Sequence, residues 1–184
     1  AKADTIVFDK TGTLTYASPT VADIIPFGDM DRDEVLKVAA CLEEHYPHSM
    51  ANAVVKEAAK EHINHEEMHS QVEYVVAHGI SSIIEGKKTI IGSRHFVFED
   101  EHAAVPKGEE YKFENLPEQY SHLYLAIGGV LAGVVCISDP LREEAAAVLT
   151  SLKKLGIKKT VMMTGDNERT AAAIAKQVGV DMYY

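Results

Sequence analysis

The sequence predicts an α/β domain with a parallel sheet, interrupted by a segment of α+β type. Residues 5–8, TIVF, form a short β-branched and aromatic run, which indicates a buried strand. Near the other end a strand at 160–163 stands between two helices, the alternation typical of a parallel sheet. The residues between these ends show another pattern, with a helix pair and successive strands.

The helices near the end of the sequence carry cap signals. The first is expected from Asp139 as N-cap and Pro140 at the first helical position to Gly156, which fits the position after the helix. The second follows TGDN and stops at Gly179. These signals place a strand, a polar loop and a helix in succession.

The middle of the sequence predicts an antiparallel sheet and a helix pair. The pair is expected at 31–45 and 49–62, where apolar residues recur on one face. Segment 99–122 is polar and indicates a loop with one short helix. Strands are expected at 20–27, 71–79, 80–92 (a hairpin turning at Gly86), 123–130 and 131–138. We therefore expect a split first domain at 1–16 and 138–184, and an inserted domain at 17–137.

Composition excludes several classes of protein. The 184 residues carry a net charge of −10 without a basic run, so we expect no nucleic-acid partner. No stretch approaches the roughly 20 apolar residues of a membrane span, and the start lacks the pattern of a secretory signal. Cys41 and Cys136 lie far apart in sequence and are expected to be reduced thiols.

A carboxylate follows the first strand directly. Sites in open parallel sheets form beyond the carboxyl ends of the strands, so Asp9 and the segment 164–166 should converge. An Asp there can act as a nucleophile that accepts a phosphoryl group, with Lys10, free backbone N–H groups and the Thr164 hydroxyl near the phosphate. The alternative is that Asp9 only caps a turn.

Three segments resemble the P-type ATPases: DKTGTLT (9–15), DPLR (139–142) and TGDN (164–167), in the family's order. The resemblance implies a haloacid-dehalogenase-like Rossmann phosphorylation domain, incomplete here, interrupted by a nucleotide-binding domain. It implies phosphorylation of Asp9 by ATP, with Mg²⁺ bound by the Asp9 carboxylate and the backbone carbonyl of Thr11. The further residues that it implies for the phosphorylation site and the hinge are Lys10, Thr164, Asp166, Asp139 and Arg142.

The residue type at position 11 distinguishes the P-type ATPases from the soluble phosphatases of the same superfamily. Soluble phosphatases of the same superfamily carry an Asp at this position, which acts as general acid and base in hydrolysis of the aspartyl phosphate. Threonine cannot do so near neutral pH, so a long-lived phosphoenzyme is expected. A soluble haloacid-dehalogenase-like phosphatase remains the alternative.

The inserted domain resembles that of heavy-metal-transporting P-type ATPases. The family's signature His aligns with His48 and its Glu, five residues earlier, with Glu43; His45 is an alternative for the His. The family's glycines imply nucleotide contacts at Gly79, Gly92 and the adjacent Ser93. Three positions depart from the family: Ser49 replaces Pro, Ala77 replaces Gly and Ser93 replaces Asn. An acceptor-only carboxylate suits the adenine amine, whereas a lone His at a helix start is more often structural.

The resemblance implies a larger protein around this sequence. We expect a fragment of a bacterial pump that exports heavy-metal cations, with membrane helices and an actuator domain elsewhere. The fragment would lie on the cytoplasmic side of the cell membrane. By itself it would bind ATP with little or no turnover, so a nucleotide-binding module without catalysis is the second alternative.

Three histidines, His62, His65 and His69, have a spacing that could place them on one side of a helix. Such a trio could bind Zn²⁺. Surface histidines in a solvated loop, next to Glu66 and Glu67, are the alternative.

Overall fold

The computed structural model describes residues 3–45, 48–63, 69–75 and 79–184. The chain divides into two compact units. Unit 1 comprises Ala1–Pro19, Glu118–Ser121 and Ser138–Tyr184, and unit 2 comprises Thr20–Pro117 and His122–Ile137. Each unit has its own sheet and its own hydrophobic core.

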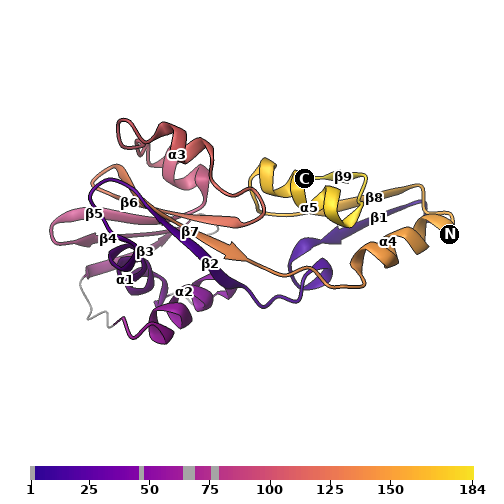
Figure 1. Cartoon of the computed structure of the whole chain (residues 1–184), viewed down its shortest axis with the longest axis horizontal. Helices are drawn as coiled ribbons and strands as arrows, with labels where there is room; N and C mark the ends of the chain where they lie inside the picture. The colour runs from indigo at the N-terminus through magenta and orange to yellow at the C-terminus, as the bar shows by residue number, and fades with distance from the viewer. Residues whose placement is uncertain (1–2, 46–47, 64–68, 76–78) are drawn as a thin grey trace. The chain divides into compact units, whose positions relative to one another are not determined.

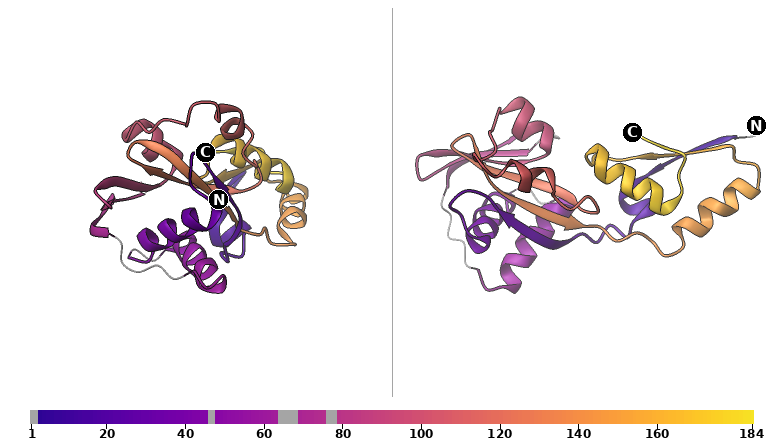
Figure 2. Two further views of the ribbon diagram at one scale, coloured as in Figure 1. Left: turned by 60° about the vertical axis from the view of Figure 1, so that its left-hand side comes forward. Right: turned by 45° about the horizontal axis from the view of Figure 1, so that its top comes forward.

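Unit 1 is built on a parallel sheet with the strand order β1-β8-β9. β1 (Thr5–Asp9) pairs in parallel with β8 (Lys159–Met163), which pairs in parallel with β9 (Met182–Tyr183). Two helices, α4 (Ala145–Lys154) and α5 (Glu168–Val178), complete the unit (Figures 1 and 2). The predicted pairing of the first strand with a strand more than 150 residues later is confirmed.

The core of unit 1 lies between the helices and one face of this sheet. Phe8 and Met162 are register partners, so both side chains point to the same face. Leu149 of α4 and Ala175 of α5 pack in the same cluster. β1 and β8 are far apart in the sequence, and burial of this apolar face stabilises their pairing.

The ends of α4 and α5 agree with the glycine signals in the sequence. Gly156 follows α4 with φ +100°, and Gly179 ends α5 with φ +84°. Both values lie in the left-handed region that glycine adopts without a steric cost. At its other end α5 is capped by Asn167, whose side chain accepts a hydrogen bond from the Thr170 amide.

The predicted start of α4 is wrong. The helix begins at Ala145 instead of Pro140, and its N-cap residue, Glu144, makes no side-chain capping hydrogen bond. Asp139 is not a cap because its carboxylate accepts a hydrogen bond from the Thr15 hydroxyl, at 2.7 Å. A long-range partner has replaced the local one.

Unit 2 contains a six-stranded sheet in the order β2-β7-β6-β5-β4-β3. The pairs β3–β4, β4–β5 and β5–β6 are antiparallel, and the hairpin between β4 and β5 turns at Glu85 and Gly86, both with positive φ. This sheet confirms the predicted α+β type. The strands are β2 (Thr20–Pro26), β3 (His69–Val75), β4 (Gly79–Ile84), β5 (Lys87–Gly92), β6 (Ser121–Ile127) and β7 (Val130–Ser138).

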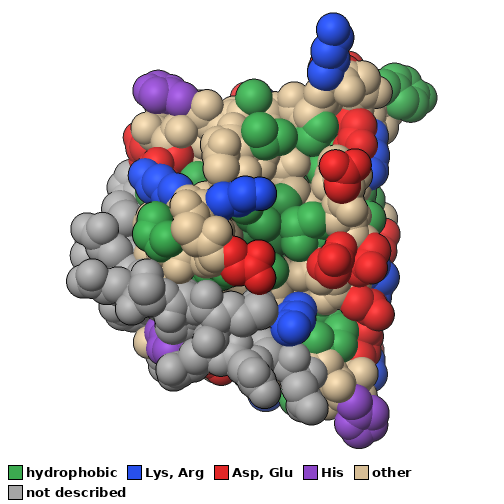
Figure 3. Space-filling view, turned by 90° about the vertical axis from the view of Figure 1, so that its left-hand side faces the viewer, with side chains coloured by type: hydrophobic (Ala, Val, Ile, Leu, Met, Phe, Trp, Pro, Cys, Tyr) green, Lys and Arg blue, Asp and Glu red, His purple; other side chains and the backbone are tan. Residues whose placement is uncertain are grey.

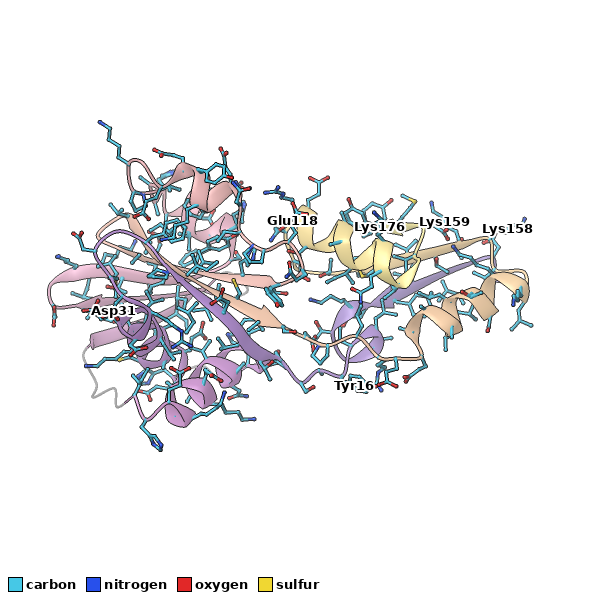
Figure 4. The ribbon with its side chains drawn as sticks, viewed as in Figure 1. Tyr16, Asp31, Glu118, Lys158, Lys159 and Lys176 are labelled. Atoms are coloured by element: carbon cyan, nitrogen blue, oxygen red, sulfur yellow. The ribbon has the colours of Figure 1, made fainter. Side chains whose placement is uncertain are left out.

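A pair of helices, α1 (Arg32–Glu43) and α2 (Ser49–Lys60), covers one face of this sheet (Figure 1). The capping box at Asp31, labelled in Figure 4, fixes the start of α1. The short helix predicted in the polar segment is α3 (Glu110–Glu114), and it lies over the other face (Figure 2). There Phe113 packs edge-on against Phe98, with ring centroids 5.1 Å apart.

Acidic side chains line one edge of the face of unit 2 that Figure 3 draws. Within the described ranges, no helix is both long and apolar enough to cross a membrane. The zinc hypothesis stays a prediction, because His65 lies outside the described residues and only the backbone of His69 is described.

Candidate functional site

Asp9 ends β1 at the carboxyl edge of the parallel sheet. It pairs in register with Met163, the last residue of β8, so the loop from Thr164 to Asp166 leaves the same edge. Asp9 is exposed, and its side chain makes no capping hydrogen bond to the irregular turn Lys10–Leu14 that follows. The alternative that Asp9 caps this turn is therefore not supported by the geometry.

The TGDN loop is tied to the Asp9 loop by a buried ion pair. Lys10 Nζ lies 2.5 Å from Asp166 Oδ2, and both side chains are less than a tenth exposed. The Thr164 hydroxyl donates to the same Asp166 oxygen at 3.2 Å and accepts from the Asp166 amide at 3.1 Å. The structure thus brings together three of the predicted site residues, Lys10, Thr164 and Asp166.

Thr15 closes the turn after Asp9. Gly12 has φ +80°, which bends the chain so that its amide donates to the Thr15 hydroxyl oxygen at 3.1 Å. Thr15 is fully buried and donates to Asp139 Oδ2. The DKTGTLT and DPLR segments are therefore joined by a hydrogen bond, which explains why Asp139 lies next to the Asp9 loop.

Arg142 supports the same junction. Its backbone amide donates to the Leu14 carbonyl at 2.9 Å, and its guanidinium lies 5.1 Å from the ring centre of Tyr16, labelled in Figure 4. Asp139 Oδ1 is buried without a hydrogen-bond partner among the described residues. Asp139 and Arg142 thus join the first segment of unit 1 to its last.

In unit 2, Glu43 and His48 come together at the junction of α1 and α2. His48 is the N-cap of α2, and its Nδ1 accepts from the Ala51 amide at 3.3 Å, which leaves the proton on Nε2. His48 Nε2 lies 3.3 Å from Glu43 Oε2. The contact with Glu43 raises the pKa of His48 above its usual value of 6.5, against the opposing effect of burial. The structural and the binding interpretation of His48 are thus compatible.

The Glu43 carboxylate is almost completely buried, with 2% of its side chain exposed. Glu43 Oε2 receives no hydrogen bond among the described residues, although His48 Nε2 lies 3.3 Å from it. A buried acceptor without a donor costs roughly 1–3 kcal/mol. Such an acceptor is chemically suited to receive an N–H group from a ligand.

Gly79 and Gly92 are also brought together, as register partners in β4 and β5. A Cβ on Gly79 would lie 2.4 Å from the Ile91 carbonyl oxygen and 2.5 Å from the Phe96 ring. Glycine is required here by packing within unit 2. Ser93 Oγ accepts from the Phe96 amide at 3.2 Å, so this hydroxyl is bonded to the helical turn His95–Asp100, whose N-cap residue is Arg94.

The oxygen donors near Asp9 fit a Mg²⁺ ion in type. The Asp9 carboxylate is exposed, and Thr11 is extended, with φ −74° and ψ +121°, within the turn. Hard cations such as Mg²⁺ prefer carboxylate and carbonyl oxygens. Asp9 and Thr11 would supply part of a coordination shell. Among the described residues, no group of three or more His, Cys, Asp or Glu could hold a metal ion.

Two polar residues of the site carried no signal in the sequence analysis. Thr15 lies within the DKTGTLT segment, but its bond to Asp139 joins residues 124 positions apart. Ser121 is hydrogen-bonded to Asp166, and it lies in a polar segment in which we recognised no motif. No local pattern in a single sequence predicts either contact.

A family model described as haloacid dehalogenase-like hydrolase matches residues 3–184. The chain belongs to this family. The parallel sheet, with Asp9 at its carboxyl edge, is the part of the structure that agrees with the fold expected from the sequence.

The relatives to which the chain is similar include heavy-metal P-type ATPases. The chain is 34% identical over 181 residues to a zinc-exporting P-type ATPase of Mycobacterium marinum, covering 98% of this chain and 25% of the relative. It thus spans about a quarter of that relative's length.

Two solved structures are similar to the chain. The catalytic domain of a CPx-ATPase, studied for its changes upon nucleotide binding, has a TM-score of 0.71 at 26% identity, covering 100% of this chain and 61% of that one. The N-domain of a copper-transporting P-type ATPase has a TM-score of 0.56 at 25% identity, covering 65% and 99%.

Proposed function

We propose that this chain is the ATP-binding and phosphorylated part of a heavy-metal-exporting P-type ATPase. Asp9 accepts the γ-phosphate of ATP. The observation that carries the proposal is the exposed Asp9 at the carboxyl edge of the parallel sheet, beside the loop that bears Thr164. The relatives at 98% coverage of the chain support the same class of reaction.

The chemistry follows from the position of Asp9. A carboxylate oxygen attacks the γ-phosphorus, a new O–P bond forms, and the bond to the β–γ bridging oxygen breaks, so ADP leaves. Asp9 and the Thr11 carbonyl would hold Mg²⁺, which supplies charge neutralisation at the phosphate. Because the Thr11 side chain cannot act as a general base near neutral pH, the aspartyl phosphate persists.

Lys10 and Asp166 support this reaction by holding Thr164. The Lys10 ammonium is bonded to Asp166, and Asp166 accepts from the Thr164 hydroxyl. The pair therefore orients the loop that faces the phosphate oxygens. The single proton of the Thr164 hydroxyl is donated to Asp166, so this hydroxyl can donate to a phosphate oxygen only when it turns away from that carboxylate.

ATP is held by unit 2. The Glu43 carboxylate accepts the adenine amine, and His48 contacts the base from the start of α2. Gly92 and Ser93 present backbone near the ligand, and Gly79 acts indirectly by letting β4 pack closely against Phe96. Transfer then requires that the bound ATP reach Asp9.

In the full-length protein, membrane helices would carry a heavy-metal cation and an actuator domain would act on the phosphoenzyme. The chain would lie on the cytoplasmic side of a bacterial membrane. The proposal covers heavy-metal cations as a class, and the chain spans about a quarter of the length of the zinc-exporting relative.

The test is phosphoenzyme formation in the full-length transporter with γ-labelled ATP and Mg²⁺. Acid-stable label should form with the unchanged protein and be absent from Asp9→Asn, while both bind ATP equally. Label on Asp9→Asn would contradict the proposal. Rapid turnover of a simple phosphate ester by the 184-residue chain would favour a soluble phosphatase instead.

A further inference from the structure

Residues Glu118–Ser121 belong to unit 1, although the chain on both sides of them belongs to unit 2. The chain thus leaves unit 2 for four residues and then returns along β6, of which Ser121 is the first residue. Ser121 is 8% exposed. This four-residue segment therefore buries a polar side chain in unit 1, and the partners of that side chain indicate its role.

Ser121 completes the set of partners of Asp166. Its hydroxyl donates to Asp166 Oδ1, while Asp166 Oδ2 is bonded to Lys10. The Ser121 oxygen also lies 3.5 Å from Lys10 Nζ, which can donate to it. Both oxygens of a buried carboxylate are therefore bonded, one of them by a residue that lies 45 positions away in sequence.

The neighbouring residues attach the same four-residue segment to the start of α5. The Tyr120 carbonyl accepts from the Thr170 hydroxyl at 3.0 Å, and Thr170 is 1% exposed. Glu118, labelled in Figure 4, pairs with Arg169 at 2.7 Å. Both members of that ion pair are more than half exposed, so it contributes little, and the buried bonds of Ser121 and Tyr120 dominate.

We propose that Ser121 is a positioning residue for phosphoryl transfer to Asp9. Its hydroxyl fixes Asp166, and Asp166 in turn holds the Thr164 hydroxyl at the edge of the sheet where Asp9 lies. The inference rests on the proposed function. Without the Ser121 hydroxyl, Asp166 Oδ1 is a buried acceptor that has lost its donor, and the loop rearranges to regain one.

The first test is amide hydrogen exchange in the 184-residue chain. Ser121→Ala should speed exchange of the Asp166 and Thr170 amides by about tenfold or more, because bonds to charged groups contribute about 1.5–3 kcal/mol. Ser121→Thr, which keeps the hydroxyl, should restore slow exchange. Ser151→Ala, which removes an exposed hydroxyl bonded locally to the Ala147 carbonyl, is the matched control.

Unchanged exchange in Ser121→Ala would overturn the inference. If that variant does not fold, Thr170→Val removes the hydroxyl that binds the Tyr120 carbonyl while keeping the shape of the side chain. It should then speed exchange of the Asp166 amide, and slow exchange in Thr170→Val would overturn the inference instead.

The second test is the rate of phosphoenzyme formation in the full-length transporter at saturating ATP. Ser121→Ala should lower this rate about tenfold and leave the ATP dissociation constant unchanged, and Ser121→Thr should recover it. An unchanged rate in Ser121→Ala overturns the role of Ser121 and leaves the proposed function intact. If the unchanged protein forms no phosphoenzyme, the proposed function fails, and hydrogen exchange still decides whether Ser121 orders the loop.

Discussion

The two units differ in how a buried carboxylate is hydrogen-bonded. In unit 1 the Asp166 carboxylate is bonded on both oxygens, by Lys10 on one and Ser121 on the other. In unit 2 the Glu43 side chain is 2% exposed, against 8% for Asp166, and its Oε2 receives no hydrogen bond among the described residues. The first arrangement holds the Thr164 loop in place. The second leaves the acceptor that the proposed function assigns to ATP.

The largest expected effect is the loss of the Lys10 ammonium. Lys10→Met leaves the buried Asp166 charge uncompensated, which should destabilise unit 1 by about 3–5 kcal/mol in urea denaturation. Lys158→Met, at an exposed position of the same unit, should change stability by about 0.5 kcal/mol or less. Adding Asp166→Asn to Lys10→Met should recover part of the loss. Equal stability of the two lysine variants would contradict a fixed, fully bonded site.

The next effect concerns the packing of unit 2. Gly79→Ala should destabilise this unit by about 1–3 kcal/mol, because the new methyl group would meet the Ile91 carbonyl and the Phe96 ring. Gly86→Asn is the control, since the Gly86 site is open and Asn tolerates its positive φ. Thermal unfolding of both variants measures the difference. A Gly79→Ala variant as stable as the control would show that packing does not require glycine at this position.

The smallest effect is a pH dependence. The Glu43 contact raises the pKa of His48, so the pair stabilises the fold at pH values below about 6.5. That contribution is lost as the pH rises through the folded-state pKa. In Glu43→Gln the pKa of His48, followed by NMR, should fall toward 6.5, and the stability difference from the unchanged chain should be largest in mild acid. An unaltered pKa would show that the two side chains do not interact in solution.

Local signals predicted most of the fold. Gly156 and Gly179 marked the helix ends because a positive φ is a local demand that glycine satisfies. The start of α4 was predicted wrongly. Asp is a residue type that often caps helices, but the Asp139 carboxylate accepts a hydrogen bond from Thr15, which is far away in the sequence. Helix-capping propensity describes how a residue type behaves when its partners are its neighbours in sequence. Asp139 instead bonds to Thr15, a partner that the local sequence does not reveal.

The same limit applies to the sites. Asp9 and the Thr164 loop could be placed together from strand order alone, because parallel strands end at a common edge. Ser121 could not, because a serine in a polar segment has no pattern that reveals its partner. The nucleotide contact expected at Gly79 stays a prediction, and the structure shows that the Phe96 ring occupies the space where a Cβ of residue 79 would stand.

The central claim is that unit 2 binds ATP through Glu43 and His48. Calorimetric titration of ATP into the 184-residue chain without Mg²⁺ tests it most directly, beside His48→Ala and His48→Asn. Asn can replace the capping acceptor for the Ala51 amide but not the imidazole, so it separates helix stability from binding. The account predicts saturable binding to the unchanged chain that weakens about tenfold or more in both variants, with the stability lost only in His48→Ala. Absence of binding to the folded chain, or equal binding by all three proteins, would contradict it.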